Sequence, residues 1–298
     1  MVKCEYKGRP TMKFTITKPE KLIKALIHNV QGMSFGSAQK TIRLGKVKVN
    51  NKRTKDNIDL KNGDIIDIYE FNKTKPNIPI IYEDDNIIIV NKPQAIECAT
   101  RDKSSDNTYS LEELLEDKSA IVVHRLDRLT EGIVVLARSK EVASKFEKIF
   151  RTREVNKFYK AYVYGKVQNT GIQKAYLKKN NKTSMVEISD KELPDYKEIL
   201  TEITTITEHN NNSLLDIKLH TGRTHQIRAH LSHLGHSILG DTKYNTNDQK
   251  TNIYRNQYKG YFLTAYKIEF NISEPTLKYL NDLHIEIIPS WLELIKNS

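Results

Sequence analysis

The patterns along this 298-residue sequence predict an α+β fold in two parts. Residues 12–72 carry two helical patterns and short strands, and from residue 80 onward short β-branched runs alternate with longer helical ones. Residues 73–79, which lie between them, are polar and hold two prolines, as is typical of a linker. The length suits one small and one large domain. The predicted domains are therefore residues 1–72 and residues 80–298.

The first domain is predicted to be a small α/β unit. Hydrophobic residues recur at helical spacing after Pro19, which favours a helix start, and a second helical pattern stops at Gly45. The Asn50-Asn51 and Asn62-Gly63 pairs are typical of turns next to short strands. The predicted elements are helices over residues 22–30 and 37–44 and strands over residues 47–49 and 65–69.

Positive charge is concentrated in this first domain. The whole chain carries a net charge of +11 with a pI near 9.3, which favours a polyanionic partner such as nucleic acid. Between residues 34 and 55 there are basic residues and no acidic ones. Such a run is usually a solvated face, but on one helix–turn–strand unit it can follow a phosphate backbone. The candidate RNA contacts are Lys40, Arg43, Lys46, Lys48, Lys52 and Arg53.

The second domain is predicted to contain strands separated by helices. Short β-branched or alternating runs predict strands over residues 87–90, 121–123, 158–167 and 215–219. Amphipathic patterns predict helices over residues 139–151 and 224–234, the second ended by Gly235. Residues 168–207 are polar, and their pattern does not assign them to an element.

One charged segment lies between two apparently buried strands. His-Arg-Leu-Asp-Arg (124–128) follows residues 121–123 and precedes the apolar run 133–137. Charged side chains are rarely buried unless they are paired. The segment therefore predicts either a structural ion pair or a reactive carboxylate, Asp127, held in a cleft.

Two further motifs accompany this one. Lys-Phe-Tyr-Lys-Ala occupies residues 157–161, and a stretch rich in Thr, Gly, Arg and His occupies residues 220–230 and continues to Gly-Asp-Thr-Lys-Tyr at 240–244. In this order, and with the upstream segments 81–86 and 91–93, they resemble the RluA family of RNA pseudouridine synthases over residues 80–270. Residues 44–53 resemble the S-four RNA-binding domain.

The resemblance implies a fold and an activity. The fold is a pseudouridine synthase fold with a long mixed or antiparallel sheet and a central cleft. The activity is the conversion of uridine in RNA to pseudouridine without a metal or cofactor. By resemblance, Asp127 is the catalytic carboxylate, Arg223 pairs with it and Tyr159 packs against the uracil. Arg125 would take the place of the flipped base, and His124 and Arg128 would contact RNA.

Four residues depart from the family pattern: Ala95 replaces a common glycine, Leu129 an acidic residue, Glu131 a small hydroxyl residue and Thr264 a histidine. They indicate a divergent subgroup and leave the target uridine open. Structured RNA, with large-subunit ribosomal RNA favoured, is the predicted partner, and neither a membrane nor an obligate protein partner is implied.

Two other functions stay open from the sequence. A non-catalytic RNA-binding or ribosome-assembly factor could use the same surface. A zinc hydrolase could use the five histidines between residues 220 and 236, although only His230 and His233 are closely spaced within the predicted helix. Two cysteines provide neither a disulfide framework nor a four-cysteine zinc site. No signal peptide or membrane span is predicted, so a cytoplasmic location is expected.

Overall fold

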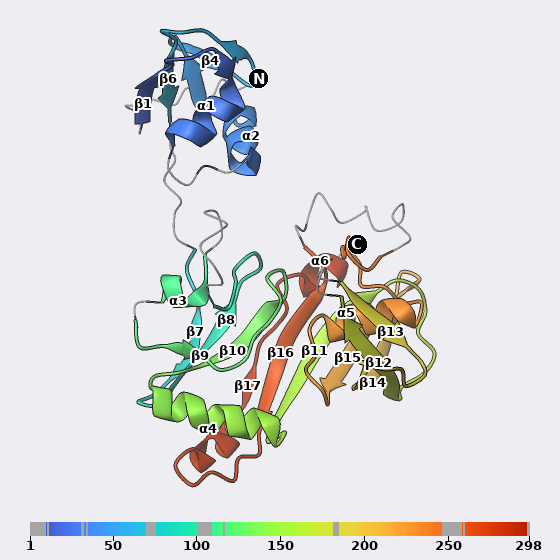
Figure 1. The fold of residues 1–298 in the computed structure, drawn as a ribbon. Coiled ribbons are helices and arrows are strands. Elements are labelled where there is room, and N and C mark those ends of the chain that lie inside the picture. Colours follow the sequence, from blue (N-terminus) through green and yellow to red (C-terminus); the bar gives the residue numbers. More distant parts are fainter. Residues whose placement is uncertain are drawn as a thin grey trace. The chain divides into compact units, whose positions relative to one another are not determined.

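The computed structural model divides the chain into two compact units (Figure 1). The main division lies between Pro76 and Asn77, and the short segment that ends at Tyr109 is grouped with the first unit. Each unit is described by itself. The structure describes residues 10, 12–30, 33, 35–69, 76–99, 109–115, 117–180, 185–245, 258 and 260–296. Among these residues, no helix has the length and apolar character needed to cross a membrane.

The first unit packs two helices against a small antiparallel sheet. Helices α1 (Leu22–Asn29) and α2 (Phe35–Arg43) lie where the helical patterns predict them. The sheet has the order β1-β6-β3-β4, and a separate pair joins β2 to β5. Leu22, Leu26, Val47 and Ile66 are buried in one core. The strands are β1 (Met12–Thr15), β2 (Glu20–Lys21), β3 (Val47–Val49), β4 (Lys52–Thr54), β5 (Asp59–Leu60) and β6 (Ile65–Ile68).

The second unit is built around one long sheet. Within the described residues the strand order is β13-β12-β14-β15-β11-β16-β10-β8-β7, with β9 paired to β10 and β17 to β16. β10 and β16 run parallel, whereas the other pairs are antiparallel, so the predicted mixed sheet is confirmed. The strands are β7 (Ile80–Glu83), β8 (Ile87–Lys92), β9 (Ile121–Val122), β10 (Glu131–Ala137), β11 (Val155–Val163), β12 (Gly171–Lys179), β13 (Val186–Ser189), β14 (Lys197–His209), β15 (Asn212–Leu219), β16 (Leu263–Phe270) and β17 (Ile285–Glu286).

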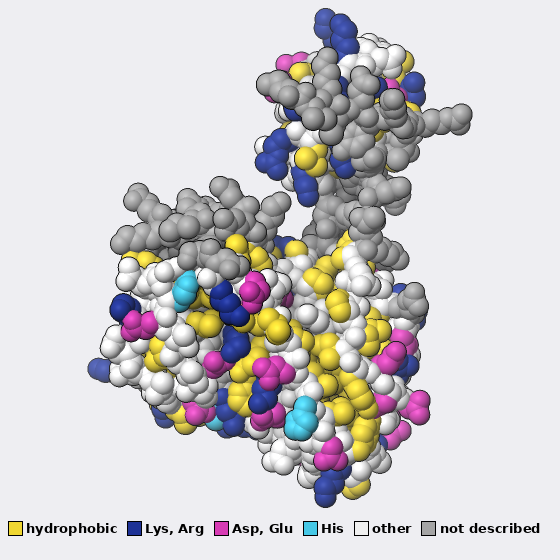
Figure 2. Space-filling view, turned by 180° about the vertical axis from the view of Figure 1, so that it is seen from behind, with side chains coloured by type: hydrophobic (Ala, Val, Ile, Leu, Met, Phe, Trp, Pro, Cys, Tyr) yellow, Lys and Arg dark blue, Asp and Glu magenta, His cyan; other side chains and the backbone are white. Residues whose placement is uncertain are grey.

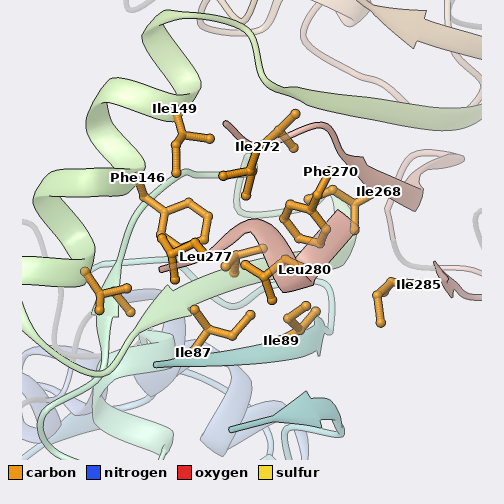
Figure 3. Packing of buried hydrophobic residues seen from close by; sticks show 14 of the residues in the cluster. Ile87, Ile89, Phe146, Ile149, Ile268, Phe270, Ile272, Leu277, Leu280 and Ile285 are labelled. Atoms are coloured by element: carbon orange, nitrogen blue, oxygen red, sulfur yellow. The ribbon is translucent and has the colours of Figure 1, made fainter. Parts of the chain in front are cut away.

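Helices pack against this sheet and fix its core. Figure 3 shows Phe146 and Ile149 of α4 (Lys140–Arg151) pointing toward Ile87 of β8, Phe270 of β16 and Leu277. Ser139 caps α4 by accepting a hydrogen bond from the Val142 N–H. The remaining helices are α3 (Leu111–Leu114), α5 (Gln226–His233), α6 (Leu292–Lys296) and the short 3₁₀ helix η2 (Lys278–Asp282).

The polar segment 168–207, which the sequence left unassigned, forms most of β12, β13 and β14. These strands lie at one end of the sheet, where few of their side chains are buried. Only a few residues in these strands alternate between buried and exposed positions. Ala175 and Leu177 are examples, and they share a buried cluster with Ala229 of α5. A strand with so little apolar surface gives a weak periodic signal.

Strand register places the loop before β10 next to β11. Gly132 of β10 pairs with Ala265 of β16, and Ala265 also pairs with Tyr159 of β11. Gly132 has φ +129°, and a Cβ at this position would lie 2.3 Å from the Ala265 carbonyl oxygen. Only glycine therefore allows this close approach. As a result, Asp127, five residues before Gly132, is brought toward Tyr159.

Candidate active site

A pocket of about 530 Å³ opens in the middle of this sheet. Its volume lies within the range of ordinary small-molecule sites. It is bounded by the loop before β10, by β11 and by the turn that precedes α5. Its lining includes Arg125, Asp127, Lys157, Tyr159, Arg223 and His225.

The charged segment is a loop that joins two antiparallel strands. Val122 of β9 pairs with Leu136 of β10, so residues 123–130 form the connection. The Thr130 N–H donates to the Asp127 carbonyl at 3.0 Å and closes the turn that carries Asp127. The segment is thus neither a strand nor a buried corner, and Asp127 keeps 25% of its side chain exposed.

Three side chains hold this loop, of which Cys98 and Lys92 are buried and His124 is partly buried. The Val135 N–H donates to His124 Nε2 at 3.0 Å, and the Leu126 N–H donates to Cys98 Sγ at 3.2 Å. Lys92 Nζ donates to the carbonyls of Pro93, Ile96 and Arg128 at 2.9–3.2 Å. Burial lowers the pKa of Lys92 to about 8. The loop is therefore fixed from the protein interior on both sides of Asp127.

Asp127 is held by Arg228, from the first turn of α5. Arg228 Nη1 donates to Asp127 Oδ2 at 2.8 Å. The same guanidinium donates through Nε and Nη2 to the buried carboxylate of Asp241, at 2.7 and 3.0 Å. Tyr261 and Tyr244 lie 4.4 and 5.1 Å from the guanidinium carbon, measured to their ring centroids. One arginine is thus shared by two carboxylates and packed between two aromatic rings.

The prediction that Arg223 pairs with Asp127 is therefore wrong. Arg223 lies in the exposed turn before α5, and its backbone N–H donates to Gln226 Oε1 at 3.1 Å. It lines the pocket without an ion pair among the described residues. The sequence did contain a signal for Arg228, because it lies beside Ile227 on the buried side of the helical pattern. An arginine on such a face needs a carboxylate partner.

Gln226 explains why the turn has this shape. Its Oε1 accepts hydrogen bonds from Thr221 Oγ1 and the Arg223 N–H, and its Nε2 donates to the Leu200 carbonyl and Thr201 Oγ1. The buried amide thus uses all its common hydrogen-bonding positions to join the turn to β14.

Tyr159 lies at the pocket wall and is almost fully buried. Burial, with the nearby charge of Asp127, raises the pKa of its phenol, so the ring stays protonated at neutral pH. The pocket therefore presents a flat, neutral aromatic surface beside a carboxylate.

The predicted RNA contacts of the second unit fall into two groups. Arg125 and Arg128 are exposed, and Arg125 lines the pocket. His124 is instead an internal anchor: its ring lies 5.0 Å from that of Phe150, and burial lowers its pKa to about 3. Because Nε2 accepts the Val135 N–H, this face of His124 is not available to RNA.

The basic residues of the first unit remain on its surface. Lys40, Arg43, Lys52 and Arg53 are exposed, whereas Lys46 and Lys48 are partly buried. Lys48 lies opposite Arg53 across the β3–β4 pair, and Lys48 Nζ is 4.7 Å from the Tyr69 ring centroid. In Figure 2, dark-blue side chains occur at several places on the described surface of this unit, whereas blue and magenta side chains lie close together on the other unit.

The histidines near α5 contact different protein groups. Among the described residues, no cluster of three His, Cys, Asp or Glu side chains could hold a metal ion. His220 contacts Glu202, His233 contacts Asp190, and His236 contacts the Tyr164 carbonyl. His230 contacts Thr201, and burial lowers the pKa of His230 to about 4. His225 contacts Tyr244.

Two departures from the family pattern contact one another. Glu131 pairs in register with Thr264, whose Oγ1 donates to Glu131 Oε1 at 2.8 Å. Trp291 Nε1 donates to Thr264 Oγ1 at 2.8 Å. Ala95 has φ +67°, a conformation that favours glycine, which explains the glycine of the family pattern at this position. The structure gives no account of Leu129.

Comparisons with known proteins agree with this geometry. A family model described as RNA pseudouridylate synthase matches residues 86–233. An RNA pseudouridine synthase of Mycoplasma capricolum subsp. capricolum is 32% identical, over 94% of this chain and 98% of the relative. Ribosomal large subunit pseudouridine synthase C of Buchnera aphidicola subsp. Acyrthosiphon pisum is 30% identical, over 80% of this chain and 82% of the relative.

The fold is also shared. Human RNA pseudouridylate synthase domain containing 1 superposes with a TM-score of 0.56 at 23% identity, over 76% of this chain and 97% of that chain. The matched residues 86–233 include Asp127, Tyr159 and Arg228, which line the pocket together. The resemblance of residues 80–270 to RNA pseudouridine synthases is thereby confirmed, and the chain belongs to the RNA pseudouridylate synthase family.

Proposed function

We propose that this enzyme converts uridine to pseudouridine in large-subunit ribosomal RNA, with Asp127 as its reactive carboxylate. The observation that carries the assignment is the environment of Asp127. Arg228 holds one carboxylate oxygen at 2.8 Å, and Asp127 lies in the wall of a pocket whose other charged lining side chains, among the described residues, are arginines and a lysine. A carboxylate in a pocket that receives a polyanion weakens simple binding, so its presence favours chemistry.

The reaction is a rearrangement within one nucleotide. The bond between the sugar C1′ and uracil N1 breaks, and a bond between C1′ and uracil C5 forms. The C5 proton is lost and N1 gains a proton, so atoms and electrons balance without a co-substrate. Breaking such a glycosidic bond is helped by a carboxylate beside the anomeric carbon. Asp127 provides that carboxylate, and Arg228 keeps it ionised and oriented.

The other roles follow from placement around the pocket. Tyr159 provides an aromatic face on which the extruded uracil would pack. Arg125, exposed at the pocket edge, would fill the gap left in the RNA stack, because extruding a base costs a few kcal/mol of stacking. Arg223, also exposed there, would contact phosphate rather than Asp127.

Ribosomal RNA is favoured by two observations. Relatives over most of this chain are named ribosomal large subunit pseudouridine synthase C. The first unit, which we propose to be an S-four-like RNA-binding domain spanning residues 1–72, carries the basic residues described above. A separate basic domain suits an RNA with structured regions that can be bound at a distance from the reacting uridine.

The deciding experiment maps pseudouridines in total RNA with and without this gene. Loss of one or more large-subunit sites, restored by the wild-type gene and not by Asp127→Asn, is the expected result. An unchanged map in cells, together with no conversion of an in vitro rRNA transcript, would refute the enzymatic proposal. The chain would then act as a non-catalytic RNA-binding factor.

The role of the first unit is tested separately through salt. Replacing Lys40, Arg43, Lys52 and Arg53 by Gln in the full chain should weaken rRNA binding and flatten its salt dependence. Each lost phosphate contact lowers the log–log salt slope by roughly one. Lys13, Lys18, Lys24 and Lys61, in the same unit but outside the basic run, provide a matched set of four substitutions. Equal effects of the two sets would show that the basic run has no specific role.

A further inference from the structure

The two oxygens of Asp127 have different surroundings. Oδ2 accepts hydrogen bonds from Arg228 Nη1 at 2.8 Å and from the Tyr261 hydroxyl at 3.5 Å. Among the described residues, no hydrogen bond reaches Oδ1. His225 Nε2 lies 3.9 Å from Oδ1, which is too far for a hydrogen bond but close enough to become one after a small movement.

His225 holds this position in an unfavourable backbone conformation. It is the residue before the first turn of α5, with φ 53° and ψ 19°, in the left-handed region. Its side chain caps no backbone group of the helix. Left-handed backbone costs a residue other than glycine roughly 1–2 kcal/mol. Strain that brings no capping bond indicates that the direction of the side chain matters.

Tyr244 fixes which nitrogen of His225 carries the hydrogen. The Val186 N–H donates to the Tyr244 hydroxyl oxygen at 3.1 Å. The Tyr244 hydroxyl lies 2.7 Å from His225 Nδ1. Among the described residues no other acceptor lies within reach of the hydroxyl hydrogen, so we infer that Tyr244 donates it to Nδ1. Nδ1 is therefore unprotonated, so the neutral imidazole carries its hydrogen on Nε2, the atom that faces Asp127.

The charges around His225 keep the imidazole neutral. Asp127 and Asp241 favour the charged form, whereas Arg228 and Lys243 disfavour it. Burial is the largest influence and lowers the pKa of His225 below its ordinary value. At neutral pH the ring is thus a hydrogen-bond donor through Nε2 and has no lone pair there to accept a proton.

We propose that His225 is a positioning residue that presents a neutral Nε2–H to Oδ1 of Asp127. Its donor aligns the second carboxylate oxygen when RNA fills the pocket, while Arg228 holds the first. Asp127 then stays ionised with both oxygens oriented, and no proton passes from His225. The proposal rests on the proposed role of Asp127 as the reactive carboxylate.

Two substitutions separate the two nitrogens of His225. In His225→Gln the side-chain amide reaches the place of Nε2 and can donate to Asp127. In His225→Asn the shorter amide reaches only the place of Nδ1, keeps the contact with Tyr244 and suits the left-handed backbone better than His. The Asn variant should therefore be at least as stable as wild type but should lack the donor.

Single-turnover rates with a large-subunit rRNA transcript give the test. His225→Gln should stay within about threefold of wild type, and His225→Asn should lose about 10- to 100-fold, the range of one hydrogen bond to a charged group. The half-saturating RNA concentration should not change in either variant. Full activity in His225→Asn would show that His225 only shapes the backbone. Strong loss in both variants, each with a wild-type melting temperature, would show that His225 moves a proton, which refutes the donor role.

A readout without turnover separates this proposal from the proposed function. Nitrogen-15 NMR of histidine-labelled wild-type protein near pH 7 should show an imidazole protonated on Nε2 and bare on Nδ1, identified by its disappearance in His225→Asn. Protonation on Nδ1 would overturn the proposal whatever the enzyme does to RNA. Conversely, activity retained in Asp127→Asn would refute the proposed carboxylate and leave the NMR result standing.

Discussion

Asp127 and Glu131 are two carboxylates four residues apart, and their environments are opposite. Glu131 is buried, and four neutral donors satisfy its oxygens: Thr264 Oγ1 and the Ser290 N–H at 2.8 Å, Ser290 Oγ at 2.5 Å and the Tyr258 hydroxyl at 3.4 Å. Asp127 has a cation on one oxygen, whereas no hydrogen-bond donor among the described residues reaches the other.

The difference shows how a structural carboxylate can be told from a reactive one. A buried charge is tolerated when hydrogen bonds fill every position around it, as at Glu131. Such a group has no oxygen left for a substrate. Asp127 is oriented but incompletely satisfied, and its incomplete side faces the pocket. A structural carboxylate is therefore distinguished from a reactive one by how many of its acceptor positions are filled, considered together with its burial.

The largest expected effect comes from exchanging each carboxylate for its amide. Asp127→Asn should lower the single-turnover rate by about 10³-fold or more while leaving RNA affinity within about twofold, because only the charge needed for chemistry is lost. Glu131→Gln should keep the rate within about threefold but lower the free energy of unfolding by about 1–2 kcal/mol. Single-turnover kinetics and urea unfolding measure the two effects.

If Glu131→Gln reduced the rate as strongly as Asp127→Asn without loss of stability, both carboxylates would belong to the reactive site. The distinction drawn from their hydrogen bonds would then be wrong.

A second test replaces each of the two arginines near Asp127 by lysine. Arg228→Lys should reduce the rate by about 10- to 100-fold, because a single ammonium cannot hold the Asp241 fork and Asp127 together. Arg223→Lys should stay within about threefold, since its charge faces the open pocket. Melting temperatures of both variants serve as the control. Equal losses at both positions would restore Arg223 as a partner of Asp127 in the RNA-bound state.

The loop that carries Asp127 should respond to acid through His124. The folded pKa of His124 is about 3, below its ordinary value of 6.5. Between these pH values the unfolded chain takes up a proton that the folded chain does not. The free energy of unfolding should therefore fall as pH drops below about 6.5, by less than about 1 kcal/mol per pH unit from this partly exposed group.

The matched variant is His124→Gln, which can still accept the Val135 N–H but does not titrate. Urea unfolding at pH 7, 6 and 5 should show a weaker pH dependence than wild type. Part of the dependence should remain, because burial also lowers the pKa of His230, to about 4. An unchanged slope would mean that His124 is already protonated in the folded protein.

The smallest expected effect is at Ala95. This residue is exposed and has φ +67°, so its methyl group adds strain without buried contacts. Ala95→Gly should raise the free energy of unfolding by up to about 1 kcal/mol, because relief of strain exceeds the added freedom of the unfolded chain. Unfolding curves in urea measure this. A loss of stability would show that the loop after Lys92 relies on a stiff backbone.

Sequence patterns predicted the strongly periodic helices and strands. They failed where tertiary contacts determine the secondary structure or the partner of a side chain. Helix α4 and strand β3 lie where their hydrophobic patterns place them. Strands β12 to β14 bury too few side chains to be recognised. Asp127 and Tyr159 were identified through motifs and do meet in one pocket.

Partners across the fold could not be predicted. Arg223 and Arg228 lie in the same motif, and only the start of α5 decides which of them reaches Asp127. Glu131 and Thr264 looked like separate departures, because nothing in the sequence shows that β10 and β16 pair in parallel with these residues opposite.

The donors around Glu131 also impose an order in time. Tyr258, Thr264 and Ser290 are separated from Glu131 by 127, 133 and 159 residues along the chain. While the protein is being synthesised, Glu131 emerges long before any of them exists. Until these donors are made, the Glu131 carboxylate is stabilised better by water than by the incomplete core. Strand β10 can therefore pack into the sheet only after β16 and Ser290 have been synthesised. The described strands of the first unit pair only with one another, so this unit can fold early. The long sheet of the second unit is completed only in the last stage of synthesis.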